Sequence, residues 1–412
     1  MRISLILLVT LTASASAGDN WPQFRGPRGE GKSDATGLPV IWSEKENVVW
    51  KTPIHDKGWS SPVIWGNQIW LTTAKADGKE MFALCVDRES GKILHDIKVF
   101  DVEKPMFCIE FNSYASPTPV IEEGRVYIHF GTYGTVCYDT SNGKKLWENH
   151  DLHCDHWRGP GSSPILHGDL LIVNFDGHDK QFVAALNKKS GEIAWKKDRE
   201  IDYGTKDGDL KKAFATPTVI TVKDKPQLIS PAAVATIAYD PKTGDELWKV
   251  YHGGMNVAQP PQYADGKVFL CTGDGGVKLL AVRTDGSGDV TKTKIEWKCS
   301  ESIPSRTAPL LIDGNLYLIN EGGIVSCVDA KTGEQAWKER VGGAFSASPL
   351  FADGKIYLFS QEEKSFVGEI GKGWKLLATN KLDAGCMATP AIAGKALFIR
   401  TKTHLYCIEK KD

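Results

Sequence analysis

The chain has 412 residues and a formal net charge of −1, because 50 Lys and Arg residues nearly balance 51 Asp and Glu residues. Broad nucleic-acid binding and docking on anionic lipid both need concentrated positive charge, so this balance argues against both. The 41 Gly, 20 Pro and 13 Trp residues, beside ordinary hydrophobicity, exclude disorder and a collagen helix. They favour a turn-rich, globular β fold.

The first 17 residues have the pattern of a signal peptide. Arg2 precedes an apolar run over residues 3–11, and Ala15, Ser16 and Ala17 form a small-residue cleavage pattern. We therefore expect a mature chain that starts near Gly18 and is periplasmic or secreted. No later stretch reaches the roughly 18 to 20 apolar residues of a membrane span, so no transmembrane segment is expected in it. The alternative, a retained anchor or a buried strand, conflicts with the short apolar core.

One sequence pattern recurs along the chain. It consists of a small residue, Asp or Asn two positions later, Gly four positions after that, and Trp four positions after the Gly. Copies begin at residues 85, 137, 185, 238 and 327. Their shared positions are Gly143, Gly191, Gly244 and Gly333, with Trp147, Trp195, Trp248 and Trp337; the first copy has His95 in place of Trp. Asp and Gly suit a hairpin turn, and Trp supplies an apolar plate that packs on the next unit.

Prolines mark a second period upstream of these copies. They stand at 62, 119, 164, 217, 261, 309, 349 and 390, with a mean spacing of about 47 residues, and all except Pro217 are followed by Gly four or five positions later and then by alternating apolar residues. Four-stranded propeller blades have this length. The sequence therefore predicts an all-β, eight-bladed propeller of four-stranded antiparallel blades.

The two chain ends predict closure of the ring. The last unit stops after its third strand near Glu409, whereas residues 47–53, with Trp50 at the Trp position, look like a fourth strand without the first three. Pairing them would remove exposed sheet edges. We expect an N-terminal extension over residues 18–46 and one propeller over residues 47–412; the alternative is an open, stacked β array.

The copies at 238–248 and 327–337 resemble the repeat of the pyrroloquinoline-quinone (PQQ)-like propeller family, Ala-x-Asp-x-x-Thr-Gly-x-x-x-Trp. The opening Trp21-Pro-Gln-Phe-Arg-Gly-Pro27 resembles the leader of secreted PQQ-like propeller proteins. The resemblance implies a relation to quinoprotein dehydrogenases, which bind PQQ and calcium, and more distantly to the outer-membrane β-barrel assembly lipoprotein, which binds proteins without a cofactor. No two cysteines here are adjacent, unlike in many quinoproteins, and Gly18 stands where a lipoprotein has Cys.

The nine cysteines divide into two kinds. Cys85, Cys137, Cys327 and Cys407 occupy the small-residue position of the repeat, where a buried thiol serves as a small apolar side chain. Cys108 and Cys154 lie in equivalent long loops and are the best candidates for a disulfide.

The candidate ligand face lies where loops entering the innermost strands meet loops of the middle hairpins. Its candidate residues are Asn112, Tyr114, His153, Asp155, His156, Trp157, Arg158, Asp176, His178, Asp274, Arg306 and Glu321. His153, Asp155 and His156 are possible metal ligands. The favoured interpretation pairs Asp155 with Arg158 and has the histidines bond loop carbonyls. Asp176, Asp274 and Glu321 could supply oxygens to calcium.

These observations favour a monomeric binding or scaffold module for a protein or glycan-like partner, with no cofactor. The alternative is a quinoprotein oxidoreductase that uses PQQ and calcium on an alcohol or sugar. A metal-dependent hydrolase centred on His153 and His156 is a third hypothesis.

Overall fold

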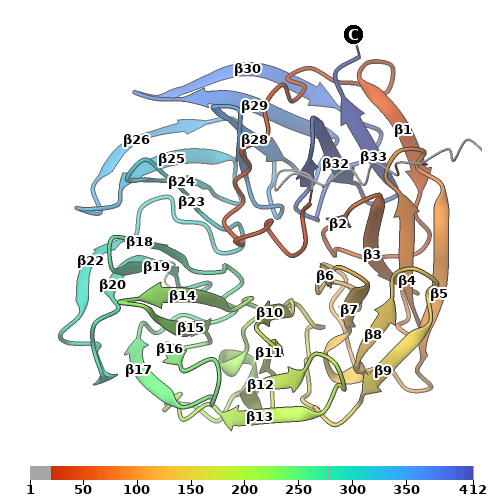
Figure 1. Ribbon diagram of the computed structural model, residues 1–412. Helices are drawn as coiled ribbons and strands as arrows, with labels where there is room; N and C mark the ends of the chain where they lie inside the picture. The colour runs from red at the N-terminus through yellow and green to blue at the C-terminus, as the bar shows by residue number, and fades with distance from the viewer. Residues whose placement is uncertain (1–19, 276–277, 412) are drawn as a thin grey trace, which may run out of the picture.

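The computed structural model describes residues 20–275 and 278–411, which form eight sheets around one axis (Figure 1). The prediction of an eight-bladed, all-β propeller is confirmed. The predicted signal peptide, residues 1–17, lies outside the described residues. Within them, no helix is long and apolar enough to cross a membrane.

The first four blades follow one another in sequence. Blade 1 contains β2 (Val63–Trp65), β3 (Gln68–Ala74), β4 (Glu80–Asp87) and β5 (Ile93–Asp101). Blade 2 contains β6 (Val120–Glu122), β7 (Arg125–His129), the 3-10 helix η1 (Gly131–Tyr133), β8 (Thr135–Asp139) and β9 (Lys145–Asn149). Blade 3 contains β10 (Ile165–His167), β11 (Leu170–Asp176), β12 (Gln181–Asn187) and β13 (Ile193–Asp198). After the 3-10 helix η2 (Gly208–Lys211), blade 4 contains β14 (Thr218–Val222), β15 (Lys225–Pro231), β16 (Ala235–Tyr239) and β17 (Glu246–Tyr251).

The remaining blades complete the ring. Blade 5 contains β18 (Gln262–Ala264), β19 (Lys267–Cys271), β20 (Leu279–Arg283) and β22 (Ile295–Cys299). Between its last two strands, β21 (Gly288–Asp289) pairs in parallel with β17 of blade 4. Blade 6 contains β23 (Leu310–Ile312), β24 (Asn315–Ile319), β25 (Ile324–Asp329) and β26 (Gln335–Arg340). Blade 7 contains β27 (Leu350–Ala352), β28 (Lys355–Phe359), β29 (Lys364–Ile370) and β30 (Trp374–Lys381). Blade 8 contains β31 (Ala391–Ala393), β32 (Ala396–Arg400), β33 (His404–Glu409) and β1 (Val48–Pro53).

The repeated Trp and Gly join several neighbouring blades, whereas Trp248 of blade 4 donates to Gln227 of its own blade at 2.9 Å. A Cβ on Gly191 of blade 3 would lie 2.5 Å from the ring of Trp147 in blade 2, and the Trp147 Nε1 donates to the Lys188 carbonyl at 3.0 Å. The same Trp-to-turn hydrogen bond recurs from Trp50 to Arg88, Trp195 to Pro241, Trp297 to Ala330 and Trp337 to Gly371. His95 occupies the Trp position against Gly143, as the alignment predicted. Trp297 is the copy that the alignment missed, because the insertion with β21 separates it from its turn.

Substituting Gly191 tests this joint between blades. Gly191 has a φ of +78° and the Trp147 ring above it, so Gly191→Ala combines backbone strain with a steric clash, and we expect a loss of about 2 to 4 kcal/mol. Gly168→Ala is the matched control, because Gly168 also has a positive φ, +57°, but no atom lies within 4 Å of its added Cβ. Urea unfolding of both variants measures the difference. Equal losses would show that the Trp plate does not restrict the turn.

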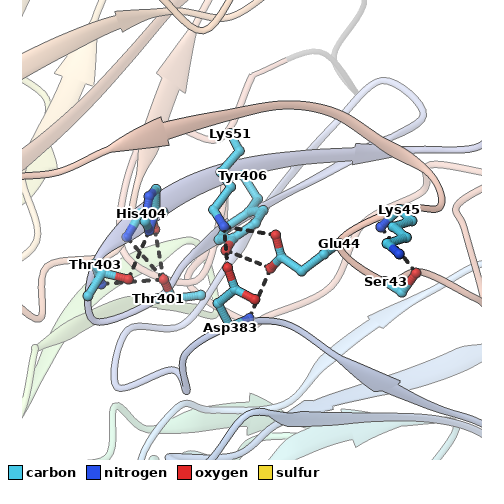
Figure 2. A network of polar contacts seen from close by, with 9 residues as sticks. All are labelled: Ser43, Glu44, Lys45, Lys51, Asp383, Thr401, Thr403, His404 and Tyr406. Atoms are coloured by element: carbon cyan, nitrogen blue, oxygen red, sulfur yellow. Dashed lines mark hydrogen bonds and ion pairs between the residues drawn. The ribbon is translucent and has the colours of Figure 1, made fainter.

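The ring closes in blade 8 as predicted. β1 pairs antiparallel with β33, with Trp50 opposite Cys407 and Thr52 opposite Leu405. A polar network covers this seam (Figure 2): the Lys51 ammonium lies 2.8 Å from a Glu44 carboxylate oxygen and 2.5 Å from an Asp383 oxygen, and the Tyr406 hydroxyl donates to Glu44 at 2.8 Å. These bonds hold the pKa of Glu44 below its usual value although partial burial opposes them.

Residues 20–46, here called the strap, lie at the centre of the ring on the side of β2, β23 and β28 before β1 begins (Figure 1). Trp21 exchanges two backbone hydrogen bonds with Ile64 of β2, and Lys32 forms a parallel bridge with Phe351 of β27. The Arg25 guanidinium, fully buried, donates to the carbonyls of Glu30 at 2.8 Å and Pro309 at 2.7 Å. The predicted N-terminal extension is therefore a packed part of the propeller.

Candidate functional site

The loops that enter the innermost strands surround a cavity of about 260 Å³ on the axis, here called the funnel. Every blade contributes the residue three positions before its repeat proline. These eight residues are Trp59, Ser116, Gly161, Phe214, Ala258, Arg306, Ser346 and Met387. Phe24 of the strap also lines the funnel, so the strap blocks one end of the axis. The opposite end, where the loops lie, is here called the funnel face.

Hydroxyl groups join the loops of neighbouring blades from blade 1 to blade 4 and from blade 6 to blade 8. Backbone amides donate to the hydroxyl of the next blade, and each hydroxyl belongs to the residue directly before a repeat proline. The bonds run from Ser61 to Thr118, Thr118 to Ser163, Ser163 to Thr216, Ala308 to Ser348 and Ser348 to Thr389, at 2.9 to 3.1 Å. The repeat prolines have no N–H to donate. The Ser and Thr side chains directly before them therefore form the hydrogen bonds between these blades near the axis.

Four of the predicted face residues line the funnel: Asn112, Arg158, Asp274 and Arg306. The Asn112 amide donates to the carbonyls of Arg158 at 3.0 Å and Pro160 at 3.1 Å, which joins the loops of blades 2 and 3. Asp274 accepts from the Asn256 amide at 3.1 Å. Arg158 pairs with Asp209, with 2.7 Å between Nε and Oδ1. The expected Asp155–Arg158 pair is thus wrong, because η2 brings Asp209 to this guanidinium from a distant part of the sequence.

Two further predicted residues hold the funnel loops from behind. One Glu321 oxygen accepts from the backbone amides of Ser305 at 2.8 Å and Arg306 at 2.7 Å. The Arg306 guanidinium then lies 4.8 Å from the centre of the Phe111 ring. Tyr114 is buried and donates its hydroxyl to the Met106 carbonyl at 2.7 Å. Neither Glu321 nor Tyr114 lines the funnel.

The cluster over residues 153–158 does not assemble a metal site. His156 is buried and its Nε2 accepts from the Thr132 amide at 3.1 Å, while Asp155 accepts from the Trp157 amide at 2.8 Å. His153 lies 3.4 Å from the Thr132 hydroxyl. Among the described residues, no group of three or more His, Cys, Asp and Glu side chains could hold a metal ion. The expectation that histidines bond loop carbonyls holds for His150, which contacts the Tyr133 carbonyl at 2.9 Å.

The predicted calcium donors are also separated. Asp176 is buried and forms two bonds with Arg199, at 2.6 and 2.9 Å, which join the ends of β11 and β13. Glu321 is occupied by the two amides, which leaves Asp274 alone among the three in the funnel lining. His178 lies at the rim, where its ring centre is 5.6 Å from that of Trp157.

The predicted disulfide between Cys108 and Cys154 is wrong. All nine cysteines lie within the described part of the chain and all are free. The Cys108 thiol faces the Arg158 carbonyl at 3.7 Å, whereas Cys154 is buried beside His156. We expect alkylation in denaturant without reductant to label nine thiols by mass spectrometry. Labelling of seven or fewer would reveal a disulfide.

Sequence reasoning missed the apolar funnel residues Phe111, Phe214 and Met387 and the polar residue Asn256. Phe214, Met387 and Trp59 each stand three positions before a repeat proline. That offset is the signal that could have located them.

Comparison with known proteins agrees with this architecture. The family profile described as outer membrane protein assembly factor BamB matches residues 85–197 and 179–412. The chain is 25% identical over 252 residues to tetrathionate hydrolase of Acidithiobacillus ferrooxidans, covering 58% of this chain and 48% of that protein. It is 21% identical over 301 residues to BamB of Shewanella oneidensis, covering 68% and 70%. The match to methanol dehydrogenase subunit 1 of Methylobacterium organophilum, at 27% identity, spans 44% of this chain and 29% of that subunit. The chain thus spans less than half the length of two of these curated relatives.

Two solved structures share the fold at low sequence identity. Quinohemoprotein alcohol dehydrogenase from Comamonas testosteroni superposes with a TM-score of 0.66 at 10% identity, covering 97% of this chain and 82% of that one. BamB from Moraxella catarrhalis gives 0.61 at 11% identity, covering 87% and 99%. The fold, the repeat and the profile match agree: the chain belongs to the PQQ-like β-propeller family that includes BamB and the quinoprotein dehydrogenases.

Proposed function

We propose that the protein is an exported binding module that holds a protein or glycan-like partner at the funnel face. The observation that carries this proposal is the funnel itself. All eight blades contribute to its wall, and Phe24 of the strap closes its inner end. A preformed concave site on a rigid scaffold is the usual form of a binding site. The leader pattern over residues 1–17 supports export.

The funnel wall combines apolar and polar groups that suit the polar end of a peptide or glycan chain. Trp59, Phe111 and Phe214 provide aromatic faces. Within the described residues, the Arg306 guanidinium has no ion pair and the buried Asn256 Oδ1 has no hydrogen-bond partner. A buried acceptor without a partner costs about 1 to 3 kcal/mol, so a ligand hydroxyl or N–H at Asn256 recovers that energy.

The rim extends this surface beyond a small molecule. Phe107 is 58% exposed, Phe111 43%, Trp157 42% and Met106 40%, and the rings of Phe107 and Trp157 lie 5.4 Å apart. Large exposed apolar side chains that gather beside a cavity are typical of an interaction site. A partner that enters the funnel and covers this rim would bury both.

The quinoprotein alternative receives less support from the described residues. A calcium ion beside PQQ needs several oxygen donors, and Asp274 is the one candidate carboxylate that lines the funnel. Asp176 and Glu321 already have partners elsewhere. The donor set does not fit calcium, so no oxidation step is assigned to these residues.

Photo-crosslinking tests the binding proposal. A photoreactive amino acid replaces Phe107 in the full chain, and the variant is expressed in the cells in which the protein naturally occurs. The matched control has the same photoreactive amino acid in place of Leu94, which is 46% exposed on the outer strand β5. We expect a discrete adduct from position 107 and none from position 94. A panel of oligosaccharides, titrated by calorimetry against the purified chain and Trp59→Ala, covers glycan partners. Equal labelling at both positions, together with no Trp59-dependent sugar binding, would contradict the proposal.

A further inference from the structure

The strap forms hydrogen bonds with the axis-facing edges of some of the innermost strands and leaves the edges of the others free of such bonds. The innermost strand of each blade forms one end of its sheet. The edge of this strand that faces the axis has no partner strand within the sheet. The strap fills part of this gap. It pairs with Ile64 of β2, and its Pro22 carbonyl accepts a hydrogen bond from the Ile121 amide of β6 at 2.8 Å. It also bonds to both the backbone N–H and the backbone C=O of Phe351 in β27. Lys32 adds a bond to the Leu311 carbonyl of β23.

The strap leaves β10, β14, β18 and β31 without such a partner. None of these four strands takes part in a bridge to the strap among the described residues. Of the four, β10, β14 and β18 are also the least buried: one residue is buried in each, whereas two or three are buried in each of β2, β6, β23, β27 and β31. Figure 1 shows the strap on the side of β2, β23 and β28, away from β10 and β14.

A second cavity of about 470 Å³ lies between these strands and the strap, here called the groove. Strap residues 27–30 form one wall, and β10, β14 and β18 form the other. Phe24 and Thr216 line both the groove and the funnel, so the two cavities are adjacent. Leu166, Val219 and Tyr263 give the groove wall partly exposed apolar side chains.

The hairpin of blade 4 determines which backbone groups of β14 face the groove. Residues 223 and 224 form a two-residue turn with φ of 48° and 65°, so its closing pair, Val222 and Lys225, is hydrogen-bonded. In an antiparallel pair every second residue then points its N–H and C=O away from the partner strand. These residues are Thr221 and Val219. Pro226, which has no N–H, lies opposite Thr221, as a pair without ladder bonds permits.

We propose that the groove is a second binding site, in which an extended peptide of a partner protein, with an apolar side chain at every second position, adds to the axis-facing edge of β14 as the strap adds to β2 and β27. The peptide exchanges backbone hydrogen bonds with Val219 and Thr221, and its apolar side chains contact Leu166 and Tyr263. Strand addition of this kind derives affinity from main-chain bonds and specificity from the side-chain pockets. The strap establishes the interface, and the groove continues it along neighbouring edges.

A labelled peptide tests the proposal on a chain that starts at Gly18. The probe is a fluorescein-labelled, lysine-tailed peptide of three Val-Thr repeats, followed by anisotropy. We expect saturable binding that weakens at least tenfold when alternate peptide nitrogens are methylated. Val219→Pro removes one outward N–H without removing a ladder bond and is tolerated on an edge strand, so it too should weaken binding at least tenfold. Val219→Thr retains the N–H and should change affinity less than twofold.

Three further measurements make the result decisive. Thermal melts show whether Val219→Pro is folded; if it is not, Thr221→Pro replaces it. Phe107→Ala at the funnel rim should leave peptide affinity unchanged, which separates this site from the funnel. Absence of saturable binding, or binding insensitive to both the methylated probe and the proline variant, would overturn the proposal. If the 412-residue chain fails to bind while the chain from Gly18 binds, the occupant is the leader of this chain and the partner-peptide proposal is overturned.

Discussion

Deletion of residues 47–53 is expected to abolish the cooperative unfolding transition of the whole propeller. The deletion removes β1, which supplies the fourth strand of blade 8 and pairs with β33 over five positions. It also removes the Trp50 hydrogen bond to Arg88 and the Thr52 hydrogen bond to Gly91, which attach blade 8 to blade 1. Without β1, the edge of β33 has no partner strand and is exposed. Thermal unfolding followed by near-ultraviolet circular dichroism measures the result.

Two point variants distinguish loss of closure from a simple shortening of the chain. Trp50→Ala removes the plate over Gly91 and should cost about 3 kcal/mol. Val49→Ala, at a side chain 46% exposed on the same strand, should change the free energy of unfolding by less than about 0.5 kcal/mol. An unchanged melting curve after the deletion would show that the ring does not depend on β1.

Acidification from pH 6.5 to pH 4.5 is expected to destabilise the protein through buried histidines. His129 is 2% exposed, and burial lowers its pKa to about 3; burial also lowers the pKa of His156 well below its usual value. The pKa of each of these histidines in the folded protein lies below the unfolded value of about 6.5. Between these two pKa values the histidine is protonated in the unfolded chain and neutral in the folded chain. The contribution of each histidine to stability is therefore present above pH 6.5 and declines by about 1.4 kcal/mol per pH unit below it.

His129→Gln tests the sign and size of this effect. The variant removes one titrating group, so the slope of the unfolding free energy against pH should be less steep by about 1.4 kcal/mol per unit between pH 6 and pH 4.5. His167→Gln, at a partly buried side chain on β10, is the matched substitution with which the slope is compared. Urea titrations at four pH values provide the measurement. A stability that rises on acidification in this window would contradict the account.

The periodic features of the fold were predictable because they are local. The spacing from Gly191 to Trp195 and from Gly333 to Trp337 encodes a turn and a docking plate within eleven residues, and repetition makes the signal plain. Ring closure followed from an incomplete last unit and from Trp50. The same reasoning failed in blade 5, where the insertion with β21 separates Trp297 from its turn.

The site was less predictable because its contacts connect distant parts of the sequence. Arg158 meets Asp209 across a blade boundary, Asp176 is taken by Arg199, and Cys108 and Cys154 occupy equivalent loops without bonding. The strap closes the axis through Arg25 and Phe24, whose turn-rich surroundings carry no strand pattern. Equivalent positions in different blades do converge, however, so the offset from each repeat proline identifies the funnel wall.

The proposed function requires the funnel to bind a partner, whereas the quinoprotein alternative requires it to bind PQQ and calcium. The most direct test titrates the purified full chain with PQQ and calcium and then assays dye reduction with alcohols and aldose sugars. We expect no calcium-dependent saturation and no substrate-dependent dye reduction. Saturable binding of PQQ with turnover, lost in Asp274→Ala, would contradict the proposed function and identify an oxidoreductase.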